Sequence, residues 1–284
     1  MGRSTSRLRN KRGQELHLEA FTPEGPVQAV LVFHHGYGEH VGRYQEVFQQ
    51  FSGAGVAIHA YDAHGHGRSE PQDPRDRCLI WSFDHLVDDL GQVGRHVRDQ
   101  YPPGTPMFVG GQSMGALTSL HLMLRDESPW QGVVLGTATI DVEWNWVLRV
   151  QASVGNLLAR LIPRAQIVPA VRGEDMSPDP AVIETMVQDP FNFLGPVRVR
   201  TALSLLNGFR GMQRDQGRIS LPIYAHHGTK DKLASLPAVK RLLECCESTD
   251  VTLKEFPDGY HEIFMNKQQK EAIDCITEWI LDHC

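Results

Sequence analysis

Residues 106–125 decide the expected fold, and their sequence is PMFVGGQSMGALTSLHLMLR. The apolar run over 107–110 predicts a buried strand, and the stretch Met114–Arg125 predicts a helix. Between them lies a Gly-x-Ser-x-Gly sequence, Gly111–Gly115, whose small residues tolerate a sharp turn from strand to helix. Such a turn exposes the hydroxyl of Ser113 above the end of a sheet. A random glycine-rich turn would carry the same letters, so Ser113 needs partners elsewhere in the chain to count as a nucleophile.

Short apolar runs alternate with helical stretches over most of the chain. This alternation predicts βαβ units and hence an α/β fold with a mostly parallel central sheet flanked by helices. The expected strands are residues 14–21, 27–33, 56–61, 106–110, 132–136, 222–226 and 251–256. The expected helices are residues 42–52, 82–100, 114–125, 236–246 and 267–281.

The alternation stops between the fifth and sixth of these strands. Apolar residues recur at helical spacing from Trp144 to Leu161, further helices are expected at 181–187 and 197–209, and no convincing strand appears. We therefore predict a sheet domain of residues 13–136 and 220–284, split by an inserted helical cap over residues 137–219. Ligands of open α/β sheets bind beyond the carboxyl ends of the strands, which places the expected site beneath the cap.

Composition narrows the class of protein. With 284 residues, 41% hydrophobic and 22% charged, the chain resembles an average globular protein, and disordered, collagen-like and coiled-coil classes are excluded. No apolar run approaches the roughly 18 residues of a membrane-spanning helix, and no hydrophobic signal segment is visible. Five irregularly spaced cysteines without a CxxC pair argue against a disulfide framework or a zinc ribbon. We expect a cytoplasmic protein.

The net charge of −6 is unevenly distributed. Residues 1–12 carry five basic and no acidic side chains, which predicts a flexible basic tail. The first six residues also match the loose pattern for N-myristoylation, although a basic residue directly after Gly2 disfavours that modification. The cap is nearly neutral and the sheet domain is acidic, which argues against nucleic-acid binding.

A serine nucleophile needs a base, and the base needs a carboxylate that orients it. On an α/β scaffold these groups follow in the order serine, acid, histidine. Asp231 follows the expected strand 222–226, and His261 follows the expected strand 251–256. Asp231 alone would be interpreted as a helix N-cap and His261 alone as a loop histidine. Asp231 and His261 each follow a strand, and they follow Ser113 in the order expected of the acid and the base. This combination favours a catalytic triad.

The loop after the expected strand 27–33 has the sequence His34-His-Gly-Tyr-Gly38. Two backbone N–H groups must stabilise the oxyanion of an acyl-transfer reaction, one from such a loop and one from the residue after the nucleophile. The predicted donors are Tyr37 and Met114. Supporting roles in the two turns fall to His35, Gly36, Gly38, Gly111 and Gly115. The alternative is an ordinary glycine turn with structural histidines.

Neither a metal nor a cofactor is expected. Six histidines lie between His34 and His66, but they lack the HExxH spacing of a zinc site. The segment Asp62–Ser69 contains a GxG but neither nucleotide-binding glycine pattern. Asp62 and Arg68 are instead expected to fix this loop beside the site.

Together these motifs resemble the monoacylglycerol lipase family, also described as lysophospholipase-like, which comprises serine hydrolases of the α/β-hydrolase fold. The resemblance extends over residues 8–282 and includes Ser177–Pro180 and Asp189-Pro190 in the cap. It implies Ser113 as nucleophile, Asp231 as acid and His261 as base, with an acyl-enzyme intermediate and no cofactor. The implied reaction converts monoacylglycerol to fatty acid and glycerol.

Several alternatives remain open at the level of sequence. The same family would also accommodate a lysophospholipase or an aromatic acyl esterase resembling caffeoyl shikimate esterase. A non-catalytic hydrolase-like receptor and an acyltransferase are further alternatives. The apolar cap face around Trp144, Trp146 and Leu148 packs on the sheet domain and lines an acyl tunnel, or it dips into a lipid surface. We favour packing for most of this face and keep transient peripheral membrane binding as a hypothesis.

Overall fold

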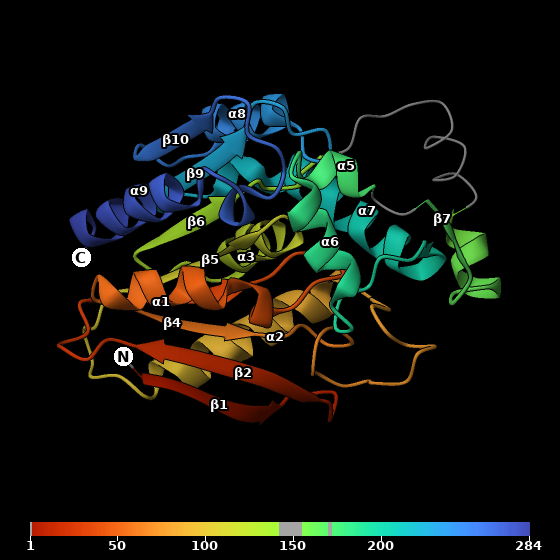
Figure 1. Cartoon of the computed structure of the whole chain (residues 1–284), viewed down its shortest axis with the longest axis horizontal. Helices are drawn as coiled ribbons and strands as arrows, with labels where there is room; N and C mark the ends of the chain where they lie inside the picture. Colours follow the sequence, from red (N-terminus) through yellow and green to blue (C-terminus); the bar gives the residue numbers. More distant parts are fainter. Residues whose placement is uncertain (1, 142–154, 170–171) are drawn as a thin grey trace.

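The computed structural model describes residues 2–141, 155–169 and 172–284 (Figure 1). Its centre is an eight-stranded sheet in the order β1-β2-β4-β3-β5-β6-β9-β10. The pairs β1–β2 and β2–β4 are antiparallel, and every other neighbouring pair is parallel. The strands are β1 (Gly2–Arg9), β2 (Glu15–Thr22), β3 (Ala29–His34), β4 (Val56–Tyr61), β5 (Met107–Gln112), β6 (Gly132–Gly136), β9 (Ile223–Gly228) and β10 (Val251–Phe256). The predicted mostly parallel sheet is confirmed.

Strand β3 shows why the sheet is covered on both faces. Its residues are all buried, and successive side chains point to opposite faces. Val30 and Val32 enter one hydrophobic core, whereas Leu31 and Phe33 enter the other. Each fully buried side chain of this size contributes about 1.5–3 kcal/mol relative to exposure. A strand that is apolar throughout is therefore stable only between two layers of helices.

Those two layers are visible in Figure 1. On one face α1 and α9 supply apolar side chains to the core, and on the other face α2, α3 and α8 do so. The helices of these layers are α1 (Gln45–Gly53), preceded by the 3-10 turn η1 (Val41–Tyr44), α2 (Phe83–Arg98), α3 (Met114–Arg125), α8 (Leu236–Cys245) and α9 (Gln269–Asp282), preceded by η3 (Ile263–Met265). All five helices predicted for the sheet domain are thus present.

The prediction of a flexible basic tail is wrong, because residues 2–9 form the edge strand β1. This strand pairs antiparallel with β2 from Gly2–Thr22 to Arg9–Glu15. Its Arg3 guanidinium lies 3.0 Å from the carboxylate of Glu19 on β2. The sequence hid this strand because its exposed, charged side chains show no apolar alternation. Charged side chains on an edge strand also discourage pairing with other chains.

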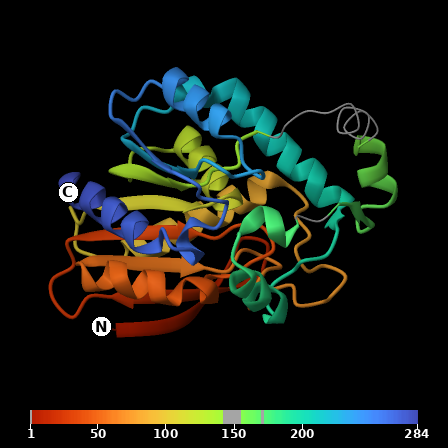
Figure 2. The same ribbon diagram turned by 45° about the horizontal axis from the view of Figure 1, so that its top comes forward.

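The described part of the segment between β6 and β9 forms a separate group at the carboxyl ends of the parallel strands (Figure 1). It contains α5 (Gly173–Met176), α6 (Pro180–Gln188), α7 (Val199–Asp215) and the 3-10 turn η2 (Gln216–Arg218). Figure 2 shows the long helix α7 leading away from a small two-stranded sheet of β7 (Gln166–Val168) and β8 (Val197–Arg198). The expectation of a strand-free segment is wrong here, because strands of three and two residues are too short to show a periodic pattern.

Part of the predicted first cap helix can be compared with the structure. Residues 155–161 are helical, and Ala159 packs against Val199 and Leu203 of α7. Trp144, Trp146 and Leu148 lie outside the described residues, and the predicted boundaries of the cap, 137–219, stay a prediction. Over the described ranges, no helix combines the length and the apolar character needed to cross a bilayer.

Candidate active site

Ser113 occupies a strained turn between β5 and α3. Its backbone has φ 54° and ψ −111°, a conformation that residues other than glycine rarely adopt. Its amide donates a 2.8 Å hydrogen bond to the carbonyl of Gly136 at the end of β6. A Cβ atom at Gly111 or Gly115 would lie 2.3 Å or 1.9 Å from the carbonyl oxygen of His34. The two glycines are therefore required for the turn to pack against β3, which explains their spacing around the serine.

His261 and Asp231 form a buried pair above the ends of β9 and β10. The Nδ1 atom of His261 lies 2.8 Å from Oδ2 of Asp231. The other carboxylate oxygen, Oδ1, accepts hydrogen bonds from the amides of Leu233 and Ala234 at 2.8 Å and 3.0 Å. His227 Nε2 lies 3.4 Å from Oδ2. These contacts fix the carboxylate and orient the imidazole, with Nδ1–H as donor and Nε2 left as acceptor.

The electrostatics of this pair follow from burial and mutual charge. Burial lowers the pKa of His261, but the carboxylate of Asp231 and its hydrogen bond outweigh burial and raise that pKa above its ordinary value. For Asp231, burial raises the pKa, but the charge and hydrogen bond of His261, the charge of His227 and the hydrogen bond from the Ala234 amide together lower the pKa below its ordinary value. A deprotonated Asp231 beside a histidine of raised basicity is the arrangement of a general base.

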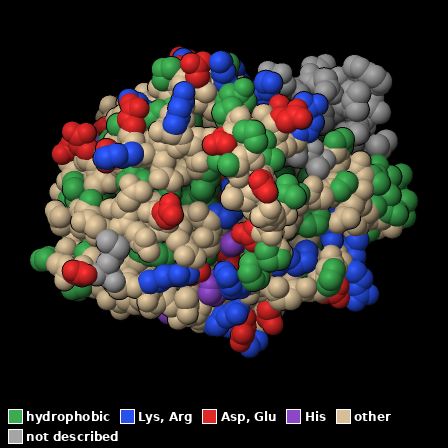
Figure 3. Space-filling model, in the orientation of Figure 1, with side chains coloured by type: hydrophobic (Ala, Val, Ile, Leu, Met, Phe, Trp, Pro, Cys, Tyr) green, Lys and Arg blue, Asp and Glu red, His purple; other side chains and the backbone are tan. Residues whose placement is uncertain are grey.

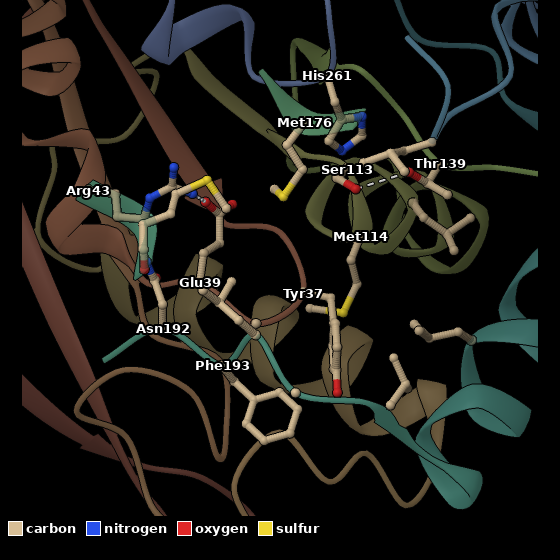
Figure 4. A pocket seen from close by; sticks show the side chains of 18 of the residues that line it. Tyr37, Glu39, Arg43, Ser113, Met114, Thr139, Met176, Asn192, Phe193 and His261 are labelled. Atoms are coloured by element: carbon tan, nitrogen blue, oxygen red, sulfur yellow. Dashed lines mark hydrogen bonds and ion pairs between the residues drawn. The ribbon is translucent and has the colours of Figure 1, made fainter. Parts of the chain in front are cut away.

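Ser113 and His261 line the same cavity, and Figure 4 shows the imidazole beside the serine. The hydroxyl of Ser113 lies 3.0 Å from the hydroxyl of Thr139. The three predicted triad residues thus come together from three loops that follow β5, β9 and β10.

The loop after β3 is held against Ser113 by hydrogen bonds. His35 Nε2 accepts from the amide of Ala63 at 2.9 Å, so its Nδ1–H donates to the carbonyl of Gly36 at 2.6 Å. Burial of the ring, together with the neighbouring histidines, holds the pKa of His35 well below its ordinary value, so the ring is neutral. A Cβ at Gly36 would lie 3.5 Å from Cβ of Ser113. Gly36 therefore lies next to the serine, and Tyr37 and Met114 line the same cavity as Ser113.

The cavity beside Ser113 has a volume of about 250 Å³ and two chemically different regions. Most of its wall is apolar, and one corner carries Glu39, Arg43 and Asn192 (Figure 4). The apolar lining comes from Tyr37, Met114, Leu117, Met176, Met186, Phe193, Leu194, Val197, Leu205, Phe209 and Leu233. Most of these residues belong to the segment between β6 and β9, so that segment covers the serine.

The polar corner is built on a buried ion cluster. Arg43 contacts the carboxylate of Glu39, and its Nη2 lies 2.9 Å from Oε2 of Glu262. The hydroxyl of Tyr44 donates to Glu39 at 2.7 Å, and the amide of Gly36 donates to the same oxygen. Burial raises the pKa of Glu39 despite the arginine. For Arg43, burial lowers the pKa, but the two carboxylates raise it further, so the guanidinium stays charged.

Some site residues were not predicted from the sequence. Thr139, Glu39, Arg43 and Asn192 reach the cavity through tertiary packing, and no spacing in the sequence links Arg43 to Glu262.

The role predicted for the loop Asp62–Ser69 is confirmed in part, because Asp62 accepts hydrogen bonds from the amides of Val41 and Arg68. Over residues 2–141, 155–169 and 172–284, no group of three or more metal-ligating side chains is placed to hold a metal ion.

Comparison with known proteins places this geometry in a family. The model of the serine aminopeptidase S33 family matches residues 25–268. A monoacylglycerol lipase of Mycolicibacterium smegmatis is 30% identical over 272 residues, covering 95% of this chain and 94% of that protein. A monoglyceride lipase of Rattus norvegicus is 28% identical over 273 residues, covering 96% and 88%.

The fold is also shared with a solved structure. A soluble variant of monoglyceride lipase from Saccharomyces cerevisiae, crystallised with a substrate analogue, has a TM-score of 0.85 at 18% identity, with 100% of this chain and 96% of that chain covered. The family model and the relatives cover most of the chain. The chain therefore belongs to the serine aminopeptidase S33 family and is a monoacylglycerol lipase-like ester hydrolase of the α/β-hydrolase fold.

Proposed function

We propose that the protein hydrolyses monoacylglycerol to fatty acid and glycerol through an acyl-enzyme on Ser113. The observation that carries this proposal is the 2.8 Å His261–Asp231 pair, which opens onto the same cavity as the strained Ser113. A strained serine and a base that line one cavity, with a buried carboxylate that orients the base, are the parts that acyl transfer needs. The family relationship supports the same reaction type.

In the proposed mechanism, His261 Nε2 accepts the proton of Ser113 as the serine oxygen attacks the ester carbonyl. Asp231 holds the imidazole tautomer and stabilises the imidazolium. The backbone N–H groups of Tyr37 and Met114 stabilise the oxyanion, and each such donor contributes about 3–4 kcal/mol to the transition state. Glycerol leaves with the proton of His261, and water then releases the fatty acid by the same route.

Two features of the cavity support a monoacylglycerol as the substrate. The apolar wall suits an acyl chain, and the corner with Glu39, Arg43 and Asn192 offers donors and acceptors to the free hydroxyls of glycerol. The charges there also bear on the lysophospholipid alternative. A phosphate would meet the carboxylate of Glu39 beside Arg43, whose charge is already paired with Glu39 and Glu262, which disfavours an anionic head group.

A substrate panel tests the proposal. We expect kcat/KM for a long-chain monoacylglycerol to exceed the values for a lysophospholipid and for an aromatic acyl ester, and we expect Ser113→Ala to abolish all three activities. A preference for the lysophospholipid or the aromatic ester would overturn the proposed substrate. Binding of monoacylglycerol without turnover would favour the receptor alternative, and acyl transfer to added glycerol would favour the acyltransferase.

We further propose that residues 137–219 form a cap that makes transient contact with a lipid surface, and that the protein acts in the cytoplasm. Leu157, Leu161, Ile162 and Ile167 are between 42% and 69% exposed. Figure 3 shows hydrophobic side chains at the edge of the molecule where β7 lies in Figure 1. Exposed apolar groups gathered on one edge are typical of interaction surfaces. All five cysteines are free thiols, which supports a reducing compartment.

Liposome flotation tests the membrane contact. We expect Leu157→Asp combined with Leu161→Asp to reduce flotation, because charged side chains would have to enter the interface. The control is Val251→Asp, which changes a 41% exposed residue on the outer strand β10. Equal flotation of both variants and the wild type would contradict the proposed surface.

A further inference from the structure

Thr139 places a second hydroxyl directly beside the nucleophile. Its Oγ1 atom lies 3.0 Å from Oγ of Ser113 (Figure 4). Its amide donates a 3.5 Å hydrogen bond to the carbonyl of the same serine. The side chain is half-buried and lines the cavity that contains Ser113 and His261. Thr139 is therefore within reach of the atom that forms and breaks the acyl bond.

The loop that carries Thr139 is fixed by its neighbours. Thr137 has a positive φ of 35°, and its amide donates a 3.0 Å hydrogen bond to the carbonyl of His226. The side-chain amide of Gln112 donates to Thr137 Oγ1 at 2.5 Å and to the carbonyl of His261 at 3.0 Å. One buried amide thus holds both the loop of Thr139 and the loop of the base. The position of the Thr139 hydroxyl is set by the same framework that sets the catalytic geometry.

The 3.0 Å contact allows either hydroxyl to donate, and the proposed role of His261 as base selects Thr139 as the donor. His261 uses its Nδ1–H for Asp231, so its Nε2 presents a lone pair. Ser113 has a single hydroxyl proton, and an imidazole nitrogen is a stronger base than a threonine hydroxyl. Once Ser113 donates to His261, its remaining lone pairs accept from Thr139.

We propose that Thr139 is a catalytic residue that donates a hydrogen bond to Ser113 Oγ and stabilises the negative charge that develops there. In acylation the serine proton moves to His261 Nε2, the bond from Oγ to the acyl carbon forms, the ester C–O bond breaks as glycerol leaves with that proton, and Thr139 keeps its own proton. In deacylation water gives a proton to His261 and its oxygen bonds to the acyl carbon, the bond from the acyl carbon to Oγ breaks, and His261 passes the proton to Oγ. In both steps Oγ is most negative near the transition state, where a hydrogen bond to it is strongest.

This inference rests on the proposed role of Ser113 as nucleophile. It is tested by the second-order rate of labelling with a fluorophosphonate probe and by kcat/KM for esters with short and long acyl chains. Thr139→Val keeps the branched shape and removes the hydroxyl, whereas Thr139→Ser keeps the hydroxyl. Hydrogen bonds to charged groups contribute enough for an expected loss of about 10- to 100-fold in Thr139→Val.

The expected pattern distinguishes chemistry from packing. Thr139→Val should lose the same factor with short-chain and long-chain esters, because the lost contact is to Oγ, and Thr139→Ser should recover most of the rate. Wild-type or faster labelling of Thr139→Val would overturn the inference. So would a loss that grows with chain length and is shared by Thr139→Ser. Thermal unfolding checks that the variants are folded, and Thr139→Ala provides a second hydroxyl-free variant.

A separate control distinguishes this inference from the proposed function. If the wild type reacts no faster with the probe than Ser113→Ala does, the nucleophile itself has been misassigned and both proposals fail. If the wild type is labelled at Ser113 and Thr139→Val is labelled equally fast, only the role of Thr139 fails.

Discussion

The backbone amide of Phe193 donates a 2.7 Å hydrogen bond to the carbonyl of Gly38, which joins the segment over the cavity to the loop that contains Tyr37. A second contact lies nearby, where His40 Nε2 is 2.8 Å from a carboxylate oxygen of Asp189. Gly38 has φ 77°, and a Cβ atom there would lie 2.6 Å from the carbonyl oxygen of Phe193. The position of the proposed oxyanion donor therefore depends on how the covering segment packs.

This contact predicts that Gly38→Ala reduces activity by displacing the loop. A displacement of about 1 Å near a reacting centre costs as much as 10²-fold in rate, and we expect kcat/KM for ester hydrolysis to fall at least about tenfold. Gly13→Ala is the matched control, because Gly13 has φ 81° but open space around the added carbon. It should lose only about 1–2 kcal/mol of stability and retain activity. Equal activity of the two variants would contradict the coupling.

The pair of His261 and Asp231 predicts the pH dependence of activity. The reaction needs neutral His261, whose pKa is raised above its ordinary value by Asp231 against the effect of burial. Activity should therefore fall as pH decreases through a midpoint above 6.5, the ordinary value for histidine. In Asp231→Asn this midpoint should move to lower pH, and kcat should drop by about 10⁴-fold, the effect of the wrong tautomer in serine proteases. Identical midpoints in both proteins would show that Asp231 does not act on His261.

The buried position of Arg43 predicts a large loss of stability on its removal. Arg43→Met leaves Glu39 and Glu262 buried without their cation, and we expect urea unfolding at pH 7 to show a loss of about 3–5 kcal/mol. Lys270→Met is the control, because Lys270 pairs with Asp274 at the same i,i+4 spacing but is 78% exposed. Its loss should stay below about 1 kcal/mol.

The pH dependence of this loss gives a second check. Burial already raises the pKa of Glu39 in the wild type, and removal of the arginine should raise it further. The folded variant then binds protons more readily than the unfolded chain, so its deficit should shrink as pH falls toward 5. A deficit equal to that of Lys270→Met, or one that grows at low pH, would contradict the role of Arg43.

The strands and helices of the sheet domain could be predicted because their signals are local. β3, β4 and β6 are short apolar runs bounded by turn residues, and α3 follows directly from the glycines around Ser113. The order of Ser113, Asp231 and His261 also follows from strand ends. β1 was missed because an exposed, charged edge strand is recognisable only by its pairing with β2.

Contacts between distant segments could not be predicted. Arg43 and Glu262 lie 219 positions apart, and Thr139 and Ser113 lie 26 apart, so no periodic pattern connects them. Tyr37 was expected to contribute its backbone to the site. Its ring also lines the cavity and meets Phe193 edge-on at 6.4 Å between ring centres. These contacts arise from the packing of the covering segment, which a single sequence does not encode locally.

The central claim is that Ser113 forms an acyl-enzyme, and mass spectrometry of peptides from the quenched protein tests it most directly. After brief mixing with an activated long-chain ester and acid quenching, we predict a mass increase of one acyl group on the peptide that contains Ser113. The same adduct should be missing from Ser113→Ala and should accumulate more slowly in Asp231→Asn. An adduct on another residue, or its persistence in Ser113→Ala, would contradict the account.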